Sequence, residues 1–156
     1  IPYLIDGDVE MTESVAMCQY LVEKYGPTDL HVNSYEADYH HYINWLAHSD
    51  ATLTFPQTVV LRYTLQEIGI ADKAAEGYRR WFVARLKLLE QTLESREYLC
   101  SNRFTIADIC VSYALHLAKS LQIEEAFKPN IKRWTDMLFG RDGFNRAVSI
   151  RYKEPE

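Results

Sequence analysis

The hydrophobic pattern at the start of the chain predicts a β-hairpin followed by a helix. Residues 1–5 are apolar and β-prone, Asp6-Gly7-Asp8 has the chemistry of a tight turn, and Val9-Glu10-Met11 alternates like a short strand. After Thr12 the apolar spacing changes to three, four and seven, which indicates a helix with one apolar stripe. This stripe contains Val15, Met17, Cys18, Leu21 and Tyr25. Gly26-Pro27 should end the helix, with the glycine in the left-handed conformation.

Helical spacing also dominates the middle of the chain, after a turn-rich segment at residues 27–34. One helix is predicted over residues 35–55, and Pro56 should end or kink it near Phe55. The side expected to face the core carries Tyr35, Tyr39, Tyr42, Ile43, Leu46 and Leu53. Another face carries Asp38, His41, Trp45, His48 and Thr52. The β-branched run 58–63 could form a strand, but its place between helical segments favours a helix, which Gly69 closes.

A long amphipathic helix is predicted over residues 71–95. Charged side chains along and just after this helix, Glu90 and Arg96 among them, are expected to form a solvated face rather than a binding patch. Further helices are predicted over residues 106–121, 131–138 and 144–150. The 106–121 segment is almost entirely apolar, so we expect it to be the buried centre of a helical domain.

A capping box is predicted at the start of that apolar helix. Thr105 stands at the N-cap position, and its hydroxyl can accept from the backbone N–H of Asp108. The Asp108 carboxylate can reach back to the backbone N–H of Thr105, which completes the reciprocal pattern. Both residues are therefore expected to be structural.

Composition and charge narrow the classes of function. The chain has 156 residues, 47% of them hydrophobic, which suffices for a globular core. The net charge of −5 and the pI near 5.6 argue against a general nucleic-acid surface and against binding to anionic membranes. No apolar run approaches the roughly 20 residues that a membrane span needs. We therefore predict neither a nucleic-acid partner nor a membrane partner.

The cysteines and histidines do not predict a metal site. Cys18, Cys100 and Cys110 are odd in number and lack metal-ligand spacing, and Cys18 and Cys110 resemble small buried hydrophobic residues. His41 and His48 can share a helix face, but no carboxylate or cysteine completes a convincing set of ligands. A reducing, cytoplasmic setting fits this pattern best.

The first 25 residues resemble the second half of the glutathione-binding domain of the cytosolic glutathione transferases, in their bacterial type. The resemblance rests on Ile1-Pro2, Asp6-Gly7-Asp8, Thr12-Glu13-Ser14, Tyr20-Leu21 and Lys24-Tyr25. It implies a cis proline after Ile1, a backbone pairing of Ile1 with the cysteinyl part of glutathione, and a grip of Glu13 and Ser14 on the γ-glutamyl end. Elementary electrostatics agrees, because a helix N-terminus attracts a carboxylate and a glutamate attracts an ammonium group. A hydroxyl or acidic residue in a first turn is common by itself, so the specificity comes from the combination of motifs.

The capping box follows Glu13-Ser14 by about 90 residues and is similar to the folding motif of the family's C-terminal domain. The resemblance implies an α+β remnant followed by an all-α part. Residues 1–26 would be the C-terminal half of a thioredoxin-like domain (strand, strand, helix), 27–34 a linker, and 35–156 a glutathione-transferase-type helical bundle. Family members carry a strand, a helix and a strand ahead of this point, with the Tyr, Ser or Cys that activates the glutathione thiol. We therefore expect the catalytic residue to lie outside this sequence.

The resemblance implies a transferase that uses glutathione as co-substrate, with no metal. Glutathione thiolate would attack a small hydrophobic electrophile, as in detoxification, and the acceptor pocket would involve Trp45, His48 and Thr52. Trp45 and His48 can equally be partly buried against a helix or a second subunit. A homodimer is implied, with helices 35–55 and 71–95 as the interface. The alternatives are a non-catalytic interaction module and a glutathione-dependent reductase or isomerase on the same fold.

Overall fold

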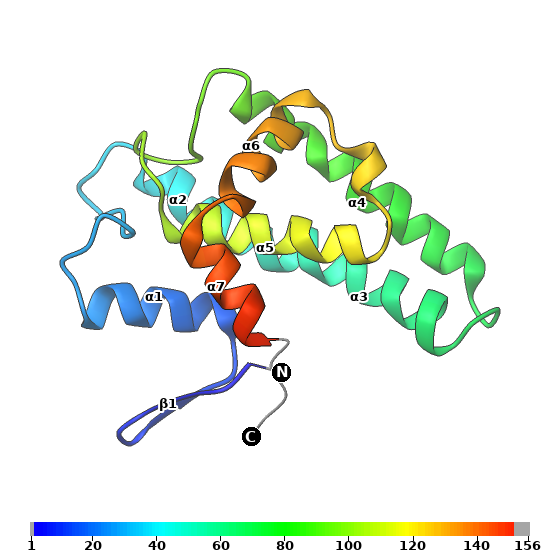
Figure 1. Cartoon of the computed structure of the whole chain (residues 1–156), viewed down its shortest axis with the longest axis horizontal. Coiled ribbons are helices and arrows are strands. Elements are labelled where there is room, and N and C mark those ends of the chain that lie inside the picture. Colours follow the sequence, from blue (N-terminus) through cyan, green and yellow to red (C-terminus); the bar gives the residue numbers. More distant parts are fainter. Residues whose placement is uncertain (1, 152–156) are drawn as a thin grey trace.

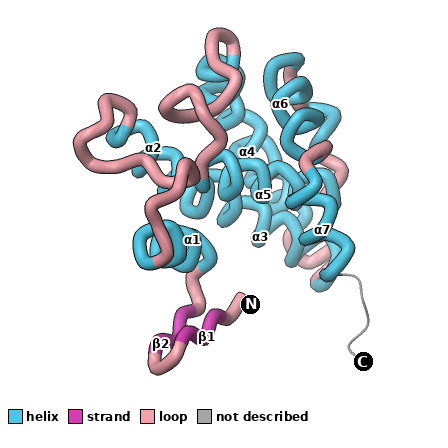
Figure 2. Tube along the Cα trace, turned by 60° about the vertical axis from the view of Figure 1, so that its left-hand side comes forward, coloured by secondary structure: helices cyan, strands magenta, loops and turns pink. Residues whose placement is uncertain are grey.

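The structure, a computed structural model, describes residues 2–151. A two-stranded hairpin lies at one edge, and helices form the rest of the molecule (Figures 1 and 2). The elements are β1 (Leu4–Asp6), β2 (Val9–Met11), α1 (Ser14–Lys24), α2 (Tyr39–Ala47), α3 (Phe55–Leu61), α4 (Asp72–Leu93), α5 (Ile106–Ser120), α6 (Pro129–Phe139) and α7 (Asp142–Arg151). Two π-helical segments, η1 (His48–Thr54) and η2 (Arg62–Gln66), flank α3, and a 3₁₀ turn, η3 (Glu124–Ala126), precedes α6. No helix within residues 2–151 is both long and apolar enough to span a bilayer.

The hairpin is antiparallel and pairs Leu4 with Met11 and Asp6 with Val9. Gly7 occupies the turn at φ +62°, a conformation that a residue with a Cβ adopts only with strain. The Asp6 carboxylate accepts hydrogen bonds from three side chains at the C-terminal end of α1. The donors are Tyr20 at 2.9 Å, Lys24 at 2.8 Å and Tyr25, the residue after the helix, at 2.5 Å. The Lys24 ammonium and the two hydroxyls lower the pKa of Asp6 to about 2. The hairpin is thus attached to α1 through Asp6, Tyr20, Lys24 and Tyr25, all of which belong to the motifs that carry the family resemblance.

The end of α1 corrects one sequence-based expectation. Gly26 does not have a positive φ; the positive-φ glycines of the described chain are Gly7 and Gly69. A Cβ on Gly26 would lie 2.7 Å from the carbonyl oxygen of Val22. Glycine is needed here because the backbone passes too close to the preceding turn for a side chain.

The helix does not end near Phe55, which was one of the two outcomes predicted for Pro56. The chain stays helical from Tyr39 to Gln66, because it changes to π-helical hydrogen bonding over His48–Thr54, where the Phe55 N–H donates to the carbonyl of Asp50. Pro56 then falls in the first turn of α3, where the missing N–H is tolerated. The 58–63 run is helical, as its context predicted.

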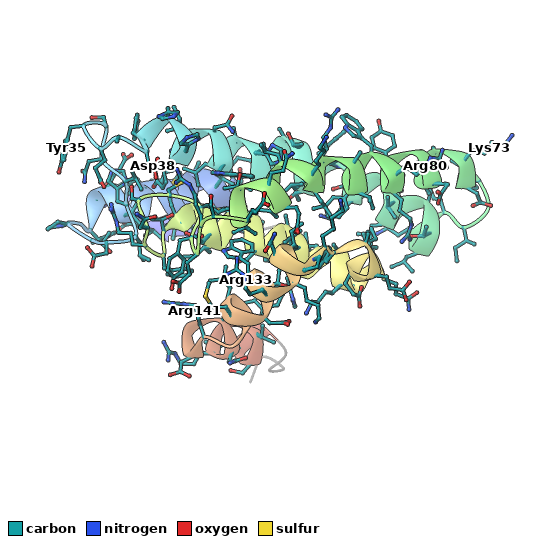
Figure 3. All side chains as sticks on the ribbon, turned by 90° about the horizontal axis from the view of Figure 1, so that it is seen from above. Tyr35, Asp38, Lys73, Arg80, Arg133 and Arg141 are labelled. Atoms are coloured by element: carbon teal, nitrogen blue, oxygen red, sulfur yellow. The ribbon has the colours of Figure 1, made fainter. Side chains whose placement is uncertain are left out.

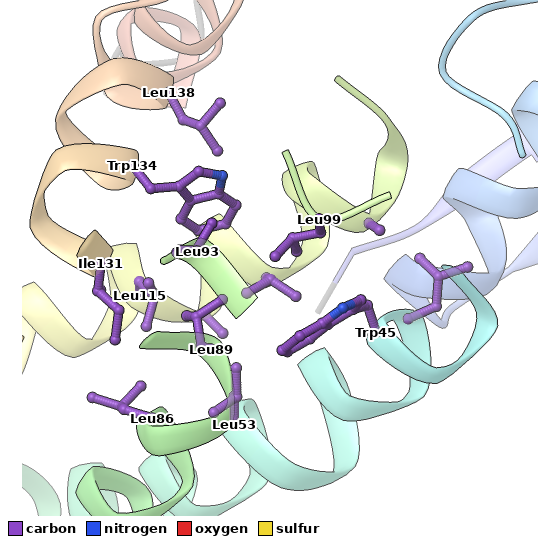
Figure 4. Close-up of a cluster of buried hydrophobic side chains, with 14 of the residues drawn as sticks. Trp45, Leu53, Leu86, Leu89, Leu93, Leu99, Leu115, Ile131, Trp134 and Leu138 are labelled. Atoms are coloured by element: carbon purple, nitrogen blue, oxygen red, sulfur yellow. The ribbon is translucent and has the colours of Figure 1, made fainter. Parts of the chain in front are cut away.

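The core-facing side of α2 and η1 differs from the predicted one. Tyr35 precedes the helix and is 85% exposed, and Ile43 is 43% exposed; Tyr35 lies at one end of the molecule in Figure 3. Trp45 is instead 3% exposed, and its ring lies among the leucines of the core (Figure 4). The buried residues are Tyr42, Trp45, Leu46, Ser49 and Leu53, a stripe at spacings of three and four.

Helix α5 is the buried centre that the sequence predicted. It contacts α1, α2, η1 and α6, and Figure 1 shows it in the middle of the molecule. The capping box is confirmed: the Thr105 N–H and hydroxyl donate to Asp108 Oδ2 at 2.9 and 3.0 Å, and Thr105 accepts from the backbone of Asp108. The backbone N–H of Leu99 donates to the other carboxylate oxygen at 3.0 Å. Burial raises the pKa of Asp108 to about 6, although these hydrogen bonds oppose the shift.

Two charged residues assigned to a solvated face have structural partners instead. The Glu90 carboxylate, on α4, caps the start of α6: it accepts from the N–H and side-chain amide of Asn130 at 3.3 and 3.0 Å and from the N–H of Ile131 at 3.0 Å. Arg96 pairs with Asp38 at 2.7 Å, and the same carboxylate accepts from the N–H of Ser101 at 2.8 Å. These partners come from distant parts of the chain, so helical periodicity could not reveal them.

The segment predicted as a linker is held in place by Arg103. Its guanidinium donates to both carboxylate oxygens of Glu36 at 2.8 and 2.9 Å and to the carbonyls of Asp29 and His31 at 2.9 and 2.6 Å. Val32, within this segment, is fully buried. The segment therefore packs as part of the core, while the division into units 1–26, 27–34 and 35–156 stays a prediction.

Candidate functional site

The predicted glutathione-binding pair lies at the N-terminus of α1. Glu13 is the N-cap residue, with an extended backbone at φ −95° and ψ 114°, and its carbonyl accepts from the N–H of Met17 at 2.9 Å. Ser14 is the first residue of the helix. Both side chains are exposed, and no side chain caps the helix. The N-cap position thus falls on Glu13.

This helix start suits a ligand that carries both signs of charge. The N–H groups of a first helical turn have no partner within the helix and carry partial positive charge. Glu13 is the acidic residue at the N-cap, and none stands within the first turn of α1 itself. A carboxylate can therefore bind the N–H groups and the Ser14 hydroxyl, while the Glu13 carboxylate can bind an ammonium group. Ile1, the third predicted glutathione contact, lies outside the described residues.

The three residues predicted for an acceptor pocket have different surroundings. Trp45 is 3% exposed and packs in the core, and it also lines a small cavity of about 160 Å³ between α2 and α4. His48 begins η1 and is half-buried, with its ring edge-on to Trp45 at 5.2 Å between centroids. Its Nε2 is buried without a hydrogen-bond partner among the described residues, and burial, with a smaller effect of Arg85, lowers its pKa. Thr52 is half-buried on the same π-helical segment, a type of segment often found at functional sites.

The structure also contains a cavity that the sequence did not predict, on the other side of α5. It has a volume of about 880 Å³ and lies between α5 and the α6–α7 corner. Its lining includes Tyr113 and His116 of α5, Phe144 of α7, and Phe104 and Arg141 of the connecting segments. The Arg141 guanidinium lies 3.7 Å from the ring centroid of Phe104. Because these residues come from separate parts of the chain, no single stretch of sequence signals the cavity, and none of Trp45, His48 and Thr52 lines it.

The described residues offer no constellation for a metal ion. Within residues 2–151, no group of three or more His, Cys, Asp or Glu side chains converges. The rings of His40 and His41 are 4.0 Å apart, but no third ligand joins them.

The family model for the glutathione S-transferase C-terminal domain matches residues 66–142. Two curated relatives extend the match over nearly the whole chain. A probable maleylacetoacetate isomerase of Vibrio cholerae is 26% identical over 153 residues, covering 95% of this chain and 70% of the relative. Glutathione S-transferase 3 of Schizosaccharomyces pombe is 25% identical, covering 90% of this chain and 63% of the relative. The chain thus spans only 63 to 70% of the length of these relatives.

Solved structures share this fold and include complexes with glutathione derivatives. The glutathione transferase Ure2p6 of Phanerochaete chrysosporium, in complex with oxidized glutathione, has a TM-score of 0.85 and 28% identity, covering 97% of this chain and 72% of that one. Ure2p5 of the same organism, cocrystallized with 1-(S-glutathionyl)-2,4-dinitrobenzene, has a TM-score of 0.81 and 25% identity, with coverages of 99% and 78%. The fold is that of a glutathione-transferase-like protein. Together, these matches support the cytosolic glutathione S-transferase superfamily.

Proposed function

We propose that this chain is part of a glutathione transferase that joins glutathione to an electrophilic, hydrophobic acceptor. The observation that carries the proposal is the start of α1, where exposed Glu13 and Ser14 stand at an uncapped helix N-terminus. That arrangement complements the carboxylate and ammonium groups of the γ-glutamyl end of glutathione. The complexes of Ure2p6 and Ure2p5 with glutathione derivatives support the choice of ligand.

In the proposed reaction, this chain binds and orients glutathione. Ser14 and the first N–H groups of α1 hold the γ-glutamyl carboxylate, Glu13 holds its ammonium group, and the backbone of Ile1 pairs with the cysteinyl part. The sulfur, as thiolate, then attacks the electrophilic carbon of the acceptor. The group that activates the thiol is proposed to belong to the part of the fold that the relatives have and this chain does not span. Orientation of the thiolate is the contribution of the residues named here.

For the acceptor pocket we propose Trp45, His48 and Thr52, of which Trp45 is almost entirely buried. We propose a homodimer that uses the outer faces of α2 and α4, where Ile43, Trp81 and Leu88 are 43, 41 and 45% exposed.

All three cysteines are free, which agrees with a reducing compartment such as the cytoplasm.

Calorimetric titration of glutathione into the full-length protein tests the proposal. We expect saturable binding that weakens about tenfold or more in Ser14→Ala, because a hydrogen bond to a charged group is lost. Ser120→Ala is the matched control, since Ser120 is exposed at the opposite kind of helix end, the C-terminus of α5. Glu13→Gln should weaken binding too, whereas Glu23→Gln, exposed later on α1, should not. If the wild type does not bind glutathione, the proposal is wrong and the chain would instead be an interaction module on this fold.

A glutathione-dependent isomerase is the second candidate, and the similarity to the probable maleylacetoacetate isomerase of Vibrio cholerae favours it. An isomerase uses glutathione without consuming it, whereas a transferase removes one thiol for every acceptor converted. Following free thiol and acceptor together therefore separates the two activities. Thiol loss that matches acceptor loss supports the transferase, and rearranged acceptor with constant thiol supports the isomerase.

A further inference from the structure

The cavity between α5 and the α6–α7 corner has the size and the walls of a small-molecule site. Its volume of about 880 Å³ falls within the range of roughly 300 to 1,000 Å³ that is usual for such sites. Its walls are mainly apolar, and the aromatic side chain of Tyr113 on α5 is 45% exposed there. None of the residues that the proposed function uses lines this cavity. It is therefore separate from the proposed glutathione and acceptor sites.

Stacked aromatic rings make one wall of the cavity rigid. The ring of Phe144, on α7, stacks on that of Phe139, on α6, with 4.6 Å between the centroids. The ring of His116, on α5, lies edge-on to Phe144 at 5.3 Å and to Phe139 at 5.8 Å. Three helices thus hold Phe144 in place, so a planar apolar group can pack against it without ordering the wall first.

Two arginines give the lining an excess of positive charge. Arg141 lies at the junction of α6 and α7 (Figure 3), and Arg146 lies on α7. Within residues 2–151, neither guanidinium has a carboxylate or carbonyl partner. Arg141 instead lies over the ring of Phe104, 3.7 Å from its centroid, which orients the guanidinium. The two arginines exceed the one acidic residue of the lining, Asp142, although the whole chain has a net charge of −5.

We propose that this cavity binds a small organic anion that combines an aromatic body with one carboxylate. The aromatic body packs against Phe144 and Tyr113, and the carboxylate pairs with the guanidinium of Arg141, whose planar fork can donate two parallel hydrogen bonds. Arg146 adds a second positive charge to the same site. A neutral ligand of the same shape fills the cavity but leaves the guanidinium groups without a partner, so charge decides which ligand binds tightly.

Calorimetric titration of 2-naphthoate into the full-length protein tests the proposal, with 2-naphthalenemethanol as the neutral probe of similar shape. We expect one naphthoate per chain, bound about tenfold or more tightly than the alcohol, because only the carboxylate makes charge-assisted hydrogen bonds. The full-length protein is used because the curated relatives are longer than this chain. No binding of naphthoate to it, or equal binding of the two probes, would overturn the proposal.

Variants locate the site. Arg141→Gln should weaken naphthoate binding about tenfold and leave the alcohol unchanged. Arg80→Gln, the matched loss of an exposed arginine on α4, should change neither. Ala147→Trp should exclude both probes, because Ala147 is an exposed residue of the lining and the indole would occupy the cavity. Thermal melting confirms that each variant is folded.

Ser14→Ala separates this site from the proposed glutathione site, because the start of α1 could also attract a carboxylate. Naphthoate should bind this variant as it binds the wild type, whether or not glutathione binding is lost. Naphthoate affinity that falls in Ser14→Ala but not in Arg141→Gln would place the anion at α1 and overturn the proposal.

Discussion

At the scale of single residues, Asp108 shows how one buried carboxylate organises its surroundings. It is fully buried and accepts from the hydroxyl and N–H of Thr105 and from the N–H of Leu99. Both of its oxygens face donors, so the carboxylate serves the start of α5 and the loop before it together. A capping box on an exposed helix would serve the helix alone.

We predict that Asp108→Asn lowers the free energy of unfolding by about 1 to 3 kcal/mol, because an amide NH₂ would replace one acceptor and leave a buried N–H unpaired. Urea unfolding at pH 7 measures the change. Asp136→Asn is the control, since Asp136 is exposed in a surface pair with Lys132, and its cost should stay below about 0.5 kcal/mol. Equal effects of the two variants would show that the carboxylate geometry is unimportant.

At the scale of elements, neighbouring helices supply what a helix lacks. Pro129 opens α6, and Lys128, at its N-cap position, makes no side-chain cap. Glu90 of α4 supplies that cap by accepting from the N–H groups of Asn130 and Ile131. At the same junction, Arg133 of α6 donates to the carbonyl of Leu93, the last residue of α4, at 2.7 Å. The two helices thus satisfy each other's free backbone groups.

Glu90→Gln should cost about 1 kcal/mol of unfolding free energy, since one charged acceptor becomes a donor that faces N–H groups. Thermal unfolding measures the loss, and hydrogen exchange should show it first at the N-terminal turn of α6. Glu94→Gln provides the comparison and should be nearly neutral, because Glu94 is exposed at the C-cap position, just after α4. If hydrogen exchange at the N-terminal turn of α6 is the same in Glu90→Gln as in the wild type, Glu90 does not cap α6.

At the scale of the whole molecule, the segment between the first helix and the bundle is fixed by two ion pairs. Arg103 holds Glu36 and the carbonyls of the segment, and Arg96 holds Asp38. The backbone also contributes, because the N–H of Ile106 donates to the carbonyl of Leu30 at 3.0 Å. The start of α5 is therefore the place where the N-terminal segment and the helices are joined.

The pair with Arg103 should make stability depend on pH. The hydrogen bond from Arg103 lowers the pKa of Glu36 from 4.5 to about 2. A lowered carboxyl pKa stabilises the folded state above the unfolded pKa, and this contribution is lost as the pH falls from about 4.5 through about 2. Glu36→Gln should therefore cost about 1 to 2 kcal/mol at pH 7, and the difference from the wild type should shrink below pH of about 4.5.

Urea unfolding of both proteins between pH 7 and pH 3 makes this measurement. Glu76→Gln is the control, because Glu76 forms an exposed pair with Arg80 on α4 and should have little effect at any pH. A cost of Glu36→Gln that stays constant down to pH 3 would contradict the assignment of the ionised pair.

Much of the helical part was predictable because its signals are local. The predicted 71–95, 106–121 and 131–138 helices differ from α4, α5 and α6 by a few residues at each end. Apolar periodicity and the Thr105–Asp108 cap act within one or two turns, so they can be recognised in the sequence alone. The continuation of the helix through Pro56 was not predictable, because a change to π-helical hydrogen bonding is not visible in residue spacing.

For the candidate site, the sequence by itself determined that Glu13 and Ser14 stand at a helix start, because turn and cap residues act on their immediate neighbours. Only the tertiary structure decided which face of α2 is buried, and so placed Trp45 in the core. The same holds for Glu90, Asp38 and Arg103, whose partners are distant in sequence. Periodicity identifies a stripe on a helix, but which stripe is covered depends on where the other helices pack.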